Sequence, residues 1–406
     1  MPFYFVPRKL KTTEIMYELL INDTPVKIWA RTVDPSAYKQ IMNLSTLPFV
    51  FHHLAFMPDV HAGVGMTIGG VLATKGAVVP NAVGVDIGCG MCAVKTDLRV
   101  EDLDSDTLRK GFMRGIRKRV PVGMDRQKTA QDEALMPQGF DIDSMPVVSR
   151  QYKSALKQIG TLGGGNHFIE LQKDQDGWMW VMIHSGSRNI GLQVAEYYDR
   201  LAKQLDLRWF SKVDPDTNLA FLPVGCKEFE DYWREMEYCV QFAFANRKLM
   251  MDRICEVIQD IRPETGFEPM INIAHNYAAW EHHFDEDVIV HRKGATRACE
   301  GEVGIIPGSQ GTKSYITEGL GNPDSFMSCS HGAGRRLSRT EAVKTLNLRE
   351  EQEKLDSRGI VHALRCQNDL EEASSAYKDI DEVMDCQKDL TRIVTTLEPV
   401  AVIKGV

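Results

Sequence analysis

Glycine recurs at short, irregular intervals through residues 61–94, HAGVGMTIGGVLATKGAVVPNAVGVDIGCGMCAV. Glycine disfavours helix interiors and permits the backbone conformations of tight turns. The stretch therefore predicts short strands joined by tight turns in this part of the chain. Residues 162–191 form a second β-rich stretch, whose pattern predicts a hairpin that turns at Asp174–Gly177.

The middle of the chain has a different pattern, in which helices dominate residues 191–262. Over residues 226–261 the apolar residues keep helical spacing; they include Trp233, Met236, Val240, Ala243, Met250, Ile254 and Val257. Strand-like, glycine-rich segments return at 288–335, followed by a polar helical tail and the apolar end LEPVAVIKGV. Strands and helices interleave without a regular βαβ rhythm, which favours an α+β fold in one large domain, with mixed sheets flanked by helices.

Composition narrows the class of protein. No apolar run approaches the roughly 18 residues of a membrane span, and the N-terminus lacks the order of regions in a signal peptide. The nine cysteines are odd in number and scattered, unlike a secreted disulfide framework. We therefore expect a cytoplasmic protein with no membrane partner.

The net charge of −8 argues against indiscriminate binding of nucleic acids but leaves room for a local basic groove. One basic segment, LRKGFMRGIRKR at residues 108–119, concentrates six cations: Arg109, Lys110, Arg114, Arg117, Lys118 and Arg119. It is either part of such a groove or the solvated face of a helix that begins near EDLDSD.

Histidine placement is the strongest signal of a functional site. Five histidines lie in small clusters of Gly, Ser, Asn or Asp: His61, His167, His184, His275 and His331. Together with Asp86 and Cys89, they predict a convergent site with a mixed oxygen, sulfur and nitrogen donor set. This set suits a divalent transition metal better than Mg²⁺ or Ca²⁺. The set contains more ligands than one tetrahedral ion needs. Two ions that share a thiolate or carboxylate would use all of them, and pairs of ions are common in enzymes that transfer phosphoryl groups.

Cys89 and Cys92 also have the spacing of a zinc knuckle or a redox dithiol. A closed four-cysteine zinc site needs a second close pair, and no other two cysteines lie near each other in the sequence. A thioredoxin-like centre needs a βαβ setting that this region lacks. The sequence favours Asp86 and Cys89 as a ligand pair over either alternative.

The segment SCSHGAGRR at residues 328–336 combines a histidine with flexible backbone N–H donors and two arginines. A neutral imidazole can attack phosphorus and form a phosphoramidate, which carries a phosphoryl or nucleotidyl group. Such a histidine needs a carboxylate on its other nitrogen, and Asp59 is a partner that pattern alone does not single out. His331 could equally be a metal ligand or a turn residue. The loop IIPGSQGTKS at 305–314 has the composition of a ligand-binding loop, although Pro-Gly-Ser is also an ordinary turn.

Seven sequence blocks follow one another along the chain: MPDVHAGVGMTIGGV, VGVDIGCG, GTLGGGNHFIE, HSGSRNIG, HNY…RKGA, IIPGSQGTKSYI and SCSHGAGR. In this order they closely resemble the blocks of the RtcB family of GTP-dependent RNA ligases. The resemblance runs from about residue 15 to the final VIKG, and the DIGCG form is similar to the bacterial branch. It implies an RtcB-like domain over residues 15–406, built around a dinuclear metal site. Residues 1–14 are then an unmatched N-terminal extension, which we expect to be disordered.

The resemblance implies an enzyme that joins an RNA 3′-phosphate or 2′,3′-cyclic phosphate to a 5′-hydroxyl, in RNA repair or tRNA splicing. GTP and two Mn²⁺ ions are the implied cofactors, and a histidine carries GMP before the RNA 3′ end receives it. Two alternatives remain. One is an enzyme that mainly guanylylates 3′-phosphate ends as caps, within a dedicated RNA/DNA repair system. The other is a metal- and RNA-binding protein without catalysis.

The resemblance also implies roles for individual residues. His331 is the position that takes GMP, Asp59 orients it, and Arg188 holds the RNA end. The implied metal ligands, with Cys89 bridging the two ions, are Asp86, Cys89, His167, His184 and His275. The implied guanylate-binding positions are Asn166, His167, Phe168, Ile169, Glu170, His275, Asn276, Pro307, Gly308, Ser309, Gln310, Ser314, His331, Gly332, Ala333, Gly334 and Lys404.

Three positions depart from the pattern of bacterial relatives, which often have Lys at Val64, Gly at Asn189 and Met at Gln310. None of the three is an expected metal ligand or the nucleophile, so we expect activity to be retained while substrate preference stays open. An activating protein partner is a further expectation that the sequence does not identify, and it does not give the oligomeric state.

Overall fold

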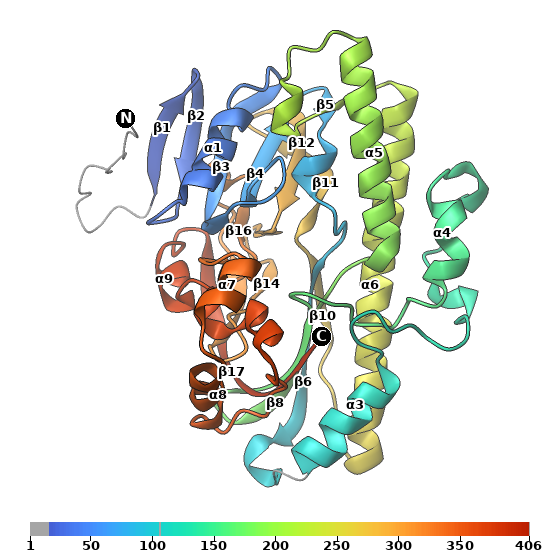
Figure 1. The fold of residues 1–406 in the computed structure, drawn as a ribbon, viewed down its shortest axis with the longest axis vertical. Coiled ribbons are helices and arrows are strands. Elements are labelled where there is room, and N and C mark those ends of the chain that lie inside the picture. The colour runs from blue at the N-terminus through green and yellow to red at the C-terminus, as the bar shows by residue number, and fades with distance from the viewer. Residues whose placement is uncertain (1–15, 105–106, 406) are drawn as a thin grey trace.

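The structure is a computed structural model that describes residues 16–104 and 107–405 (Figure 1). Its first sheet has six strands and is mostly antiparallel, with β2 and β3 as a parallel pair. In spatial order these strands are β1 (Tyr17–Ile21), β2 (Thr24–Ile28), β3 (Val50–His61), β4 (Ile68–Thr74), β12 (Glu286–Lys293) and β11 (Asn276–His283). The predicted N-terminal extension, residues 1–14, lies outside the described residues.

The second sheet has seven strands, all of them antiparallel to their neighbours. In spatial order they are β10 (Ile271–Ala274), β6 (Gly90–Arg99), β8 (Trp178–Ser185), β7 (Phe168–Asp174), β17 (Thr391–Lys404), β15 (Ser314–Gly319) and β14 (Val303–Ile306). The predicted hairpin is confirmed as β7 and β8, with the Gly177 N–H donating to the Asp174 carbonyl at 3.0 Å. Two small sheets pair β13 (Ala295–Arg297) with β16 (Ser328–Ser330) and β5 (Ala77–Val78) with β9 (Leu222–Pro223).

Two long helices, α5 (Arg188–Arg208) and α6 (Lys227–Ile261), pack side by side along one flank of the sheets (Figure 1). The bounds of α6 confirm the helix predicted over 226–261, whose apolar stripe is buried against the sheets. The shorter helices are α1 (Pro35–Leu44), α2 (Pro80–Val83), α3 (Arg114–Arg119), α4 (Val148–Ala155), α7 (Arg339–Thr345), α8 (Leu348–Asp356) and α9 (Ile380–Asp385). A π-helical turn over Thr107–Met113 leads into α3.

The apolar end of the chain does not extend the helical tail but enters the second sheet as β17, between β7 and β15. Its residues Ala401 and Ile403 pack into a core cluster with β6, β8 and α6. The mixed α+β fold with several sheets confirms the predicted fold class. Within residues 16–104 and 107–405, no helix combines the length and the apolar composition needed to cross a membrane.

Candidate active site

The predicted site residues come together where the strands of the seven-stranded sheet begin or end on one side. Strands β6 and β7 begin there, while β8, β10 and β17 end there, because neighbouring strands run antiparallel. The register places Gly90 opposite both Ser185 and Ala274. Loop residues at these strand ends are therefore adjacent in space although they are far apart in sequence.

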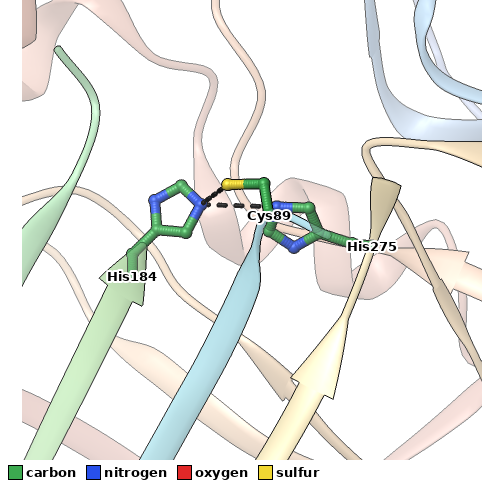
Figure 2. A group of neighbouring side chains, drawn as sticks. All are labelled: Cys89, His184 and His275. Atoms are coloured by element: carbon green, nitrogen blue, oxygen red, sulfur yellow. Dashed lines mark hydrogen bonds between the residues drawn. The ribbon is translucent and has the colours of Figure 1, made fainter. Parts of the chain in front are cut away.

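Two groups of potential metal ligands share Cys89 at these strand ends. The first is Cys89, His184 and His275, and the second is Asp86, Cys89 and His167. Cys89 Sγ lies 3.2 Å from His184 Nε2, which lies 3.3 Å from His275 Nε2, and the three side chains point toward one another (Figure 2). In the second group, His167 Nε2 lies 3.0 Å from Asp86 Oδ2 and 3.6 Å from Cys89 Sγ.

The loop before β6 holds these donors in place. The Cys89 N–H donates to the Asp86 carbonyl at 3.1 Å, forming a turn that presents both side chains to one side. The buried Arg247 of α6 donates from Nη1 to the carbonyls of Gly88 and Ser185, both at 2.9 Å, and so ties the ends of β6 and β8 together. The long predicted helix thus positions the site without entering it.

The donor set fits divalent transition metals. Burial, and to a lesser extent the neighbouring histidines, lower the pKa of His184 and His275 well below the ordinary value, so both imidazoles are neutral and able to bind a metal. Burial and Asp86 raise the pKa of the Cys89 thiol well above its ordinary value, so a thiolate there requires a cation beside it. The buried Nδ1 atoms of His167 and His275 have no hydrogen-bond partner within the described residues. Facing imidazole nitrogens and a thiol this close are typical of a metal centre.

Cys92 does not belong to this cluster. It lies within β6, fully buried in a core cluster, with its Sγ 4.0 Å from the Arg247 carbonyl. Neither of the candidate ligand groups in the described residues contains it. The structure therefore gives no support to the zinc-knuckle interpretation.

His331 lies beside the candidate metal ligands, and its ring centroid is 4.8 Å from that of His275. Asp59 of β3, which is fully buried, accepts from His331 Nδ1 at 2.6 Å and from the His331 backbone N–H at 3.1 Å. Burial favours the neutral form of Asp59, but the charge and hydrogen bond of His331 lower its pKa below the ordinary value. The ring is thereby fixed in one orientation, with Nε2 as its remaining nitrogen.

Glycine is required at Gly334, where the backbone has a φ of 72°. A Cβ at this position would lie 2.3 Å from the Asp59 carbonyl oxygen. The Lys378 N–H donates to the Gly334 carbonyl at 2.9 Å, and its Nζ donates to the carbonyls of Pro58 and Val60 at 3.1 and 2.7 Å. Both contacts fix the strand that carries Asp59 against the segment that carries His331.

A cavity of about 250 Å³ opens next to His331. Many of the predicted guanylate-binding positions line it: Asn166, Phe168, Glu170, Pro307, Gly308, Ser309, Gln310, His331, Gly332, Ala333, Gly334 and Lys404. The structure thus brings the loop at 305–314, the segment at 328–336 and the ends of β7 and β17 around one space.

Glu170 forms one wall of the cavity and is 2% exposed. Burial raises its pKa to about 7, although Lys404 and a hydrogen bond from Gln172 oppose the increase. Gln172 Nε2 donates to Glu170 Oε2 at 2.7 Å and to Ser314 Oγ at 3.1 Å. Lys404 lies with its Nζ 5.3 Å from the centroid of the Phe168 ring.

Other predicted positions lie behind the cavity wall. Ile169 packs into a core cluster, so its side chain is directed away from the cavity. Ser314 Oγ accepts from the Gly308 N–H at 3.2 Å and so supports the loop above it. Asn276 donates to the Asp86 carbonyl at 3.1 Å and accepts from the Gly294 N–H at 2.7 Å.

Arg188 is held in a sparsely populated conformation next to the metal ligands. Its φ is 61°, and a side-chain-bearing residue in such a region costs about 1–3 kcal/mol. Its Nε donates to Thr161 Oγ1 at 3.2 Å, and a Cβ at Gly163 would lie 2.1 Å from its Nη1. Surrounding contacts therefore fix a guanidinium beside Asp86, where it can hold a phosphate.

Sequence reasoning missed part of the cavity wall. Arg339 and Tyr377 also line the cavity, and both contact the buried Glu372. Arg335 and Lys404 pair with the same carboxylate at 3.2 and 3.7 Å. Glu372 and Tyr377 come from the polar tail, where no motif marks them.

The three positions that depart from bacterial relatives lie in different surroundings. Val64 is 58% exposed, whereas Gln310 is buried and donates to the Glu372 carbonyl at 2.9 Å. The Asn189 side chain donates to Gln151 Oε1 at 3.1 Å. Of the three, only Gln310 lines the cavity.

Two candidate ligand groups that share a cysteine, a histidine held by a carboxylate, and a cavity lined by glycines and arginines are together typical of metal-dependent enzymes that transfer phosphoryl or nucleotidyl groups. The family described as tRNA-splicing ligase RtcB matches residues 40–405. An RNA-splicing ligase RtcB of Escherichia coli is 40% identical, over 96% of this chain and all of its own length. A tRNA-splicing ligase RtcB of Methanococcus maripaludis is 30% identical, over 98% of this chain and 95% of its own.

The chain belongs to the RtcB family of RNA ligases and is a ligase enzyme. A third relative, an RNA-splicing ligase RtcB of Mycobacterium bovis, is 33% identical over 90% of this chain. These matches confirm the resemblance inferred from the seven sequence blocks, including its bacterial character.

Proposed function

We propose that the protein joins RNA 3′-phosphate or 2′,3′-cyclic phosphate ends to 5′-hydroxyl ends, using GTP and two Mn²⁺ ions, in RNA repair or tRNA splicing. The observation that carries this proposal is the position of His331. Its Nδ1 is held by the buried Asp59, its ring is next to His275, and it lines the cavity that Glu170 closes.

In the first step, His331 Nε2 attacks the α-phosphorus of GTP. A P–N bond forms, the bond to the β-phosphate oxygen breaks, and pyrophosphate leaves. Asp59 stabilises the positive charge that develops on the imidazole and keeps the proton on Nδ1. Backbone N–H groups of Gly332–Gly334, together with Arg335 and Arg339, would bind the charge on the phosphate oxygens, and all of these residues line the cavity.

In the second step, an oxygen of the RNA 3′-phosphate attacks the same phosphorus, and His331 leaves. The RNA 3′ end then carries GMP through a phosphoanhydride bond. In the third step, the 5′-hydroxyl attacks the RNA phosphorus, which forms the phosphodiester and expels GMP. A 2′,3′-cyclic end is first hydrolysed to the 3′-phosphate, and Arg188 holds the RNA phosphate in place.

Asp86, Cys89, His167, His184 and His275 would hold the two Mn²⁺ ions, with Cys89 shared between them. When bound, the ions neutralise the triphosphate and position the α-phosphorus. The sharing of Cys89 between the two ligand groups supports this arrangement.

Guanine selectivity is proposed to depend on Glu170, because a carboxylate can accept from both N1–H and the 2-amino group of guanine, which adenine does not present together. Glu170→Gln is expected to lower kcat/KM for GTP by about 100-fold or more and to narrow the preference for GTP over ATP. Since only the carboxylate accepts both bonds and its pKa is about 7, guanylylation of the wild-type protein should fall as pH drops below about 7. Guanylylation rates with GTP and ATP between pH 6 and 8 measure both effects.

The matched control is Glu398→Gln, because Glu398 is exposed and lies near the other end of the β17–β7 pairing. It should keep the wild-type rate, selectivity and pH profile. If Glu170→Gln retained the full preference for GTP over ATP, a group other than the Glu170 carboxylate would select guanine, and this part of the proposal would be wrong.

A ligation assay with defined RNA ends tests the whole reaction. We expect a joined product from 3′-phosphate and 2′,3′-cyclic phosphate ends with a 5′-hydroxyl strand, and only with GTP and Mn²⁺. Product that stops at a GMP-capped 3′ end, with the 5′-hydroxyl strand unused, would favour the end-capping alternative. Absence of label from GTP on both protein and RNA would favour a metal- and RNA-binding protein without catalysis.

Two further expectations remain part of the proposal. A cytoplasmic location is supported by nine cysteines that are all free. Ligation assays with and without cell extract would reveal the contribution of the expected activating protein partner.

A further inference from the structure

A second pocket, outside the cavity described above, lies between α3 and the segment at residues 360–365. Its volume is about 580 Å³. Arg114 and Arg117 of α3 line one side, and Arg365 and His362 line the other. We call it the basic pocket.

The basic pocket carries unneutralised positive charge. Arg114, Arg117 and Arg365 are exposed, and none of their side chains has an ion pair or hydrogen-bond partner among the residues that the structure describes. Asp356 is the one carboxylate in the lining, and it is engaged by His362 Nε2 at 3.3 Å. Three arginines against one carboxylate, in a chain whose net charge is −8, make a local site for anions.

The described cations of the basic segment at 108–119 lie in different surroundings. Arg119 turns toward α6, where it pairs with Glu256 at 2.7 Å and also with Asp260. Arg114 and Arg117, three residues apart, instead share the face of α3 that lines the pocket. The side chains of Arg109 and Lys110 lie outside the described part of the chain. Carboxylates of α6 thus neutralise Arg119, while Arg114 and Arg117 have no such partner among the described residues.

The guanidinium groups of the pocket lie close enough to affect one another. Although Arg117 is exposed as a whole residue, partial desolvation of its guanidinium lowers its pKa, and the nearby Arg365 cation lowers it further. Like charges held together without a counter-ion cost free energy in the unliganded protein, and a bound phosphate would relieve this cost.

Strand β17 connects the basic pocket to the active site. Val402 lines the basic pocket, and Lys404, two residues later, lines the cavity beside His331. Alternate residues of a strand share a face, and two residues span roughly 6–7 Å. Val361 of the pocket wall is bonded to β17 twice: its N–H donates to the Val400 carbonyl at 2.9 Å, and its carbonyl accepts from the Val402 N–H at 2.8 Å. Both sites therefore lie on one face of the same rigid strand.

We propose that the basic pocket binds the phosphodiester backbone of the RNA strand whose end is in the active site, with Arg114, Arg117 and Arg365 as its phosphate contacts. This inference rests on the proposed RNA-joining function, because the strand is placed by its reactive end. Planar guanidiniums bind phosphate oxygens in pairs and carry no base preference, so the pocket adds affinity without sequence specificity.

The test compares a pocket variant with a charge-matched control. The pocket variant is Arg114→Ala, Arg117→Ala and Arg365→Ala. The control removes three exposed cations at the end of α5, in the loop after it and near the start of α6: Arg208→Ala, Lys212→Ala and Arg234→Ala. The probe is a 20-nucleotide single-stranded RNA with a 3′-phosphate, and its Kd is measured by fluorescence anisotropy at several salt concentrations.

The pocket variant should bind the probe at least about 10-fold more weakly, with the slope of log Kd against log salt reduced by about 2, while the control changes Kd less than about 2-fold. Guanylylation by GTP should stay at the wild-type rate, because GTP is proposed to bind in the cavity beside His331 and not in the basic pocket. Equal weakening in pocket variant and control, or an unchanged Kd, would overturn the proposal. An unchanged Kd would leave an acidic protein segment as the ligand of the pocket.

A single charge reversal, Arg117→Glu, distinguishes a loss of RNA binding from a loss of folding. It should weaken RNA binding without lowering the melting temperature or the guanylylation rate. Reduced guanylylation would contradict the proposal, because the pocket would then act on the nucleotide step. Failure of wild-type protein to join RNA, with intact binding that depends on the pocket, would instead remove the proposed function and leave the binding site.

Discussion

Replacing His331 with alanine is expected to abolish labelling of the protein by α-labelled GTP, a loss of at least about 10⁴-fold in the rate of guanylylation. The imidazole is the nucleophile of the proposed first step, and the surrounding hydroxyls are poor substitutes for it. Because His331 contributes one side chain to the cavity wall, GTP binding should persist. Autoradiography of the denatured protein measures the labelling, and equilibrium binding measures the affinity for GTP.

Asp59→Asn is the companion variant. The carboxylate fixes the tautomer of His331 through the 2.6 Å bond to Nδ1, and an amide cannot stabilise the imidazolium to the same extent. We expect guanylylation about 10²- to 10⁴-fold slower than wild type, with the label still on His331. Persistent labelling of His331→Ala at the wild-type rate would place the nucleophile elsewhere and refute the mechanism.

The elements of the fold that sequence predicts well are those whose pattern is local. The apolar spacing over residues 226–261 predicted both ends of α6 to within one residue. The polar turn between two β-rich runs predicted the β7–β8 hairpin. Strand order is not local: β17 pairs Val402 with Glu170, more than 200 residues away. No pattern in the terminal segment LEPVAVIKGV indicates which strands receive it.

The same distinction applies to the site. Histidines in glycine-rich turns predicted a cluster because such turns bring side chains to strand ends. The Asp59–His331 pair spans 272 positions, and only the family resemblance indicated it. Glu372 and Tyr377, which organise the arginines around the cavity, follow no motif, because a buried carboxylate in a polar tail looks like any solvated acid. The arginines of the basic pocket were visible as a charged segment, but their separation from Arg119 depends on how α3 packs against α6.

Cys89→Ala is the second change expected to have a large effect. Sγ of Cys89 belongs to both ligand groups, so its removal should weaken both metal positions at once. We expect the protein to bind fewer than two Mn²⁺ ions at concentrations that saturate wild type, and guanylylation to fall at least about 10³-fold. Isothermal titration with Mn²⁺ and labelling with GTP provide the two measurements.

Cys92→Ala is the matched control, since it lies three residues away on the same segment but in the core. Losing its buried sulfur should cost about 1 kcal/mol of folding free energy and leave metal binding and guanylylation intact. Metal binding should also release a proton, because the Cys89 thiol is protonated without a cation beside it. That release should be present in Cys92→Ala and absent in Cys89→Ala. Equal loss of metal in both variants would instead assign the two cysteines to one zinc site, and the shared-thiolate arrangement would be wrong.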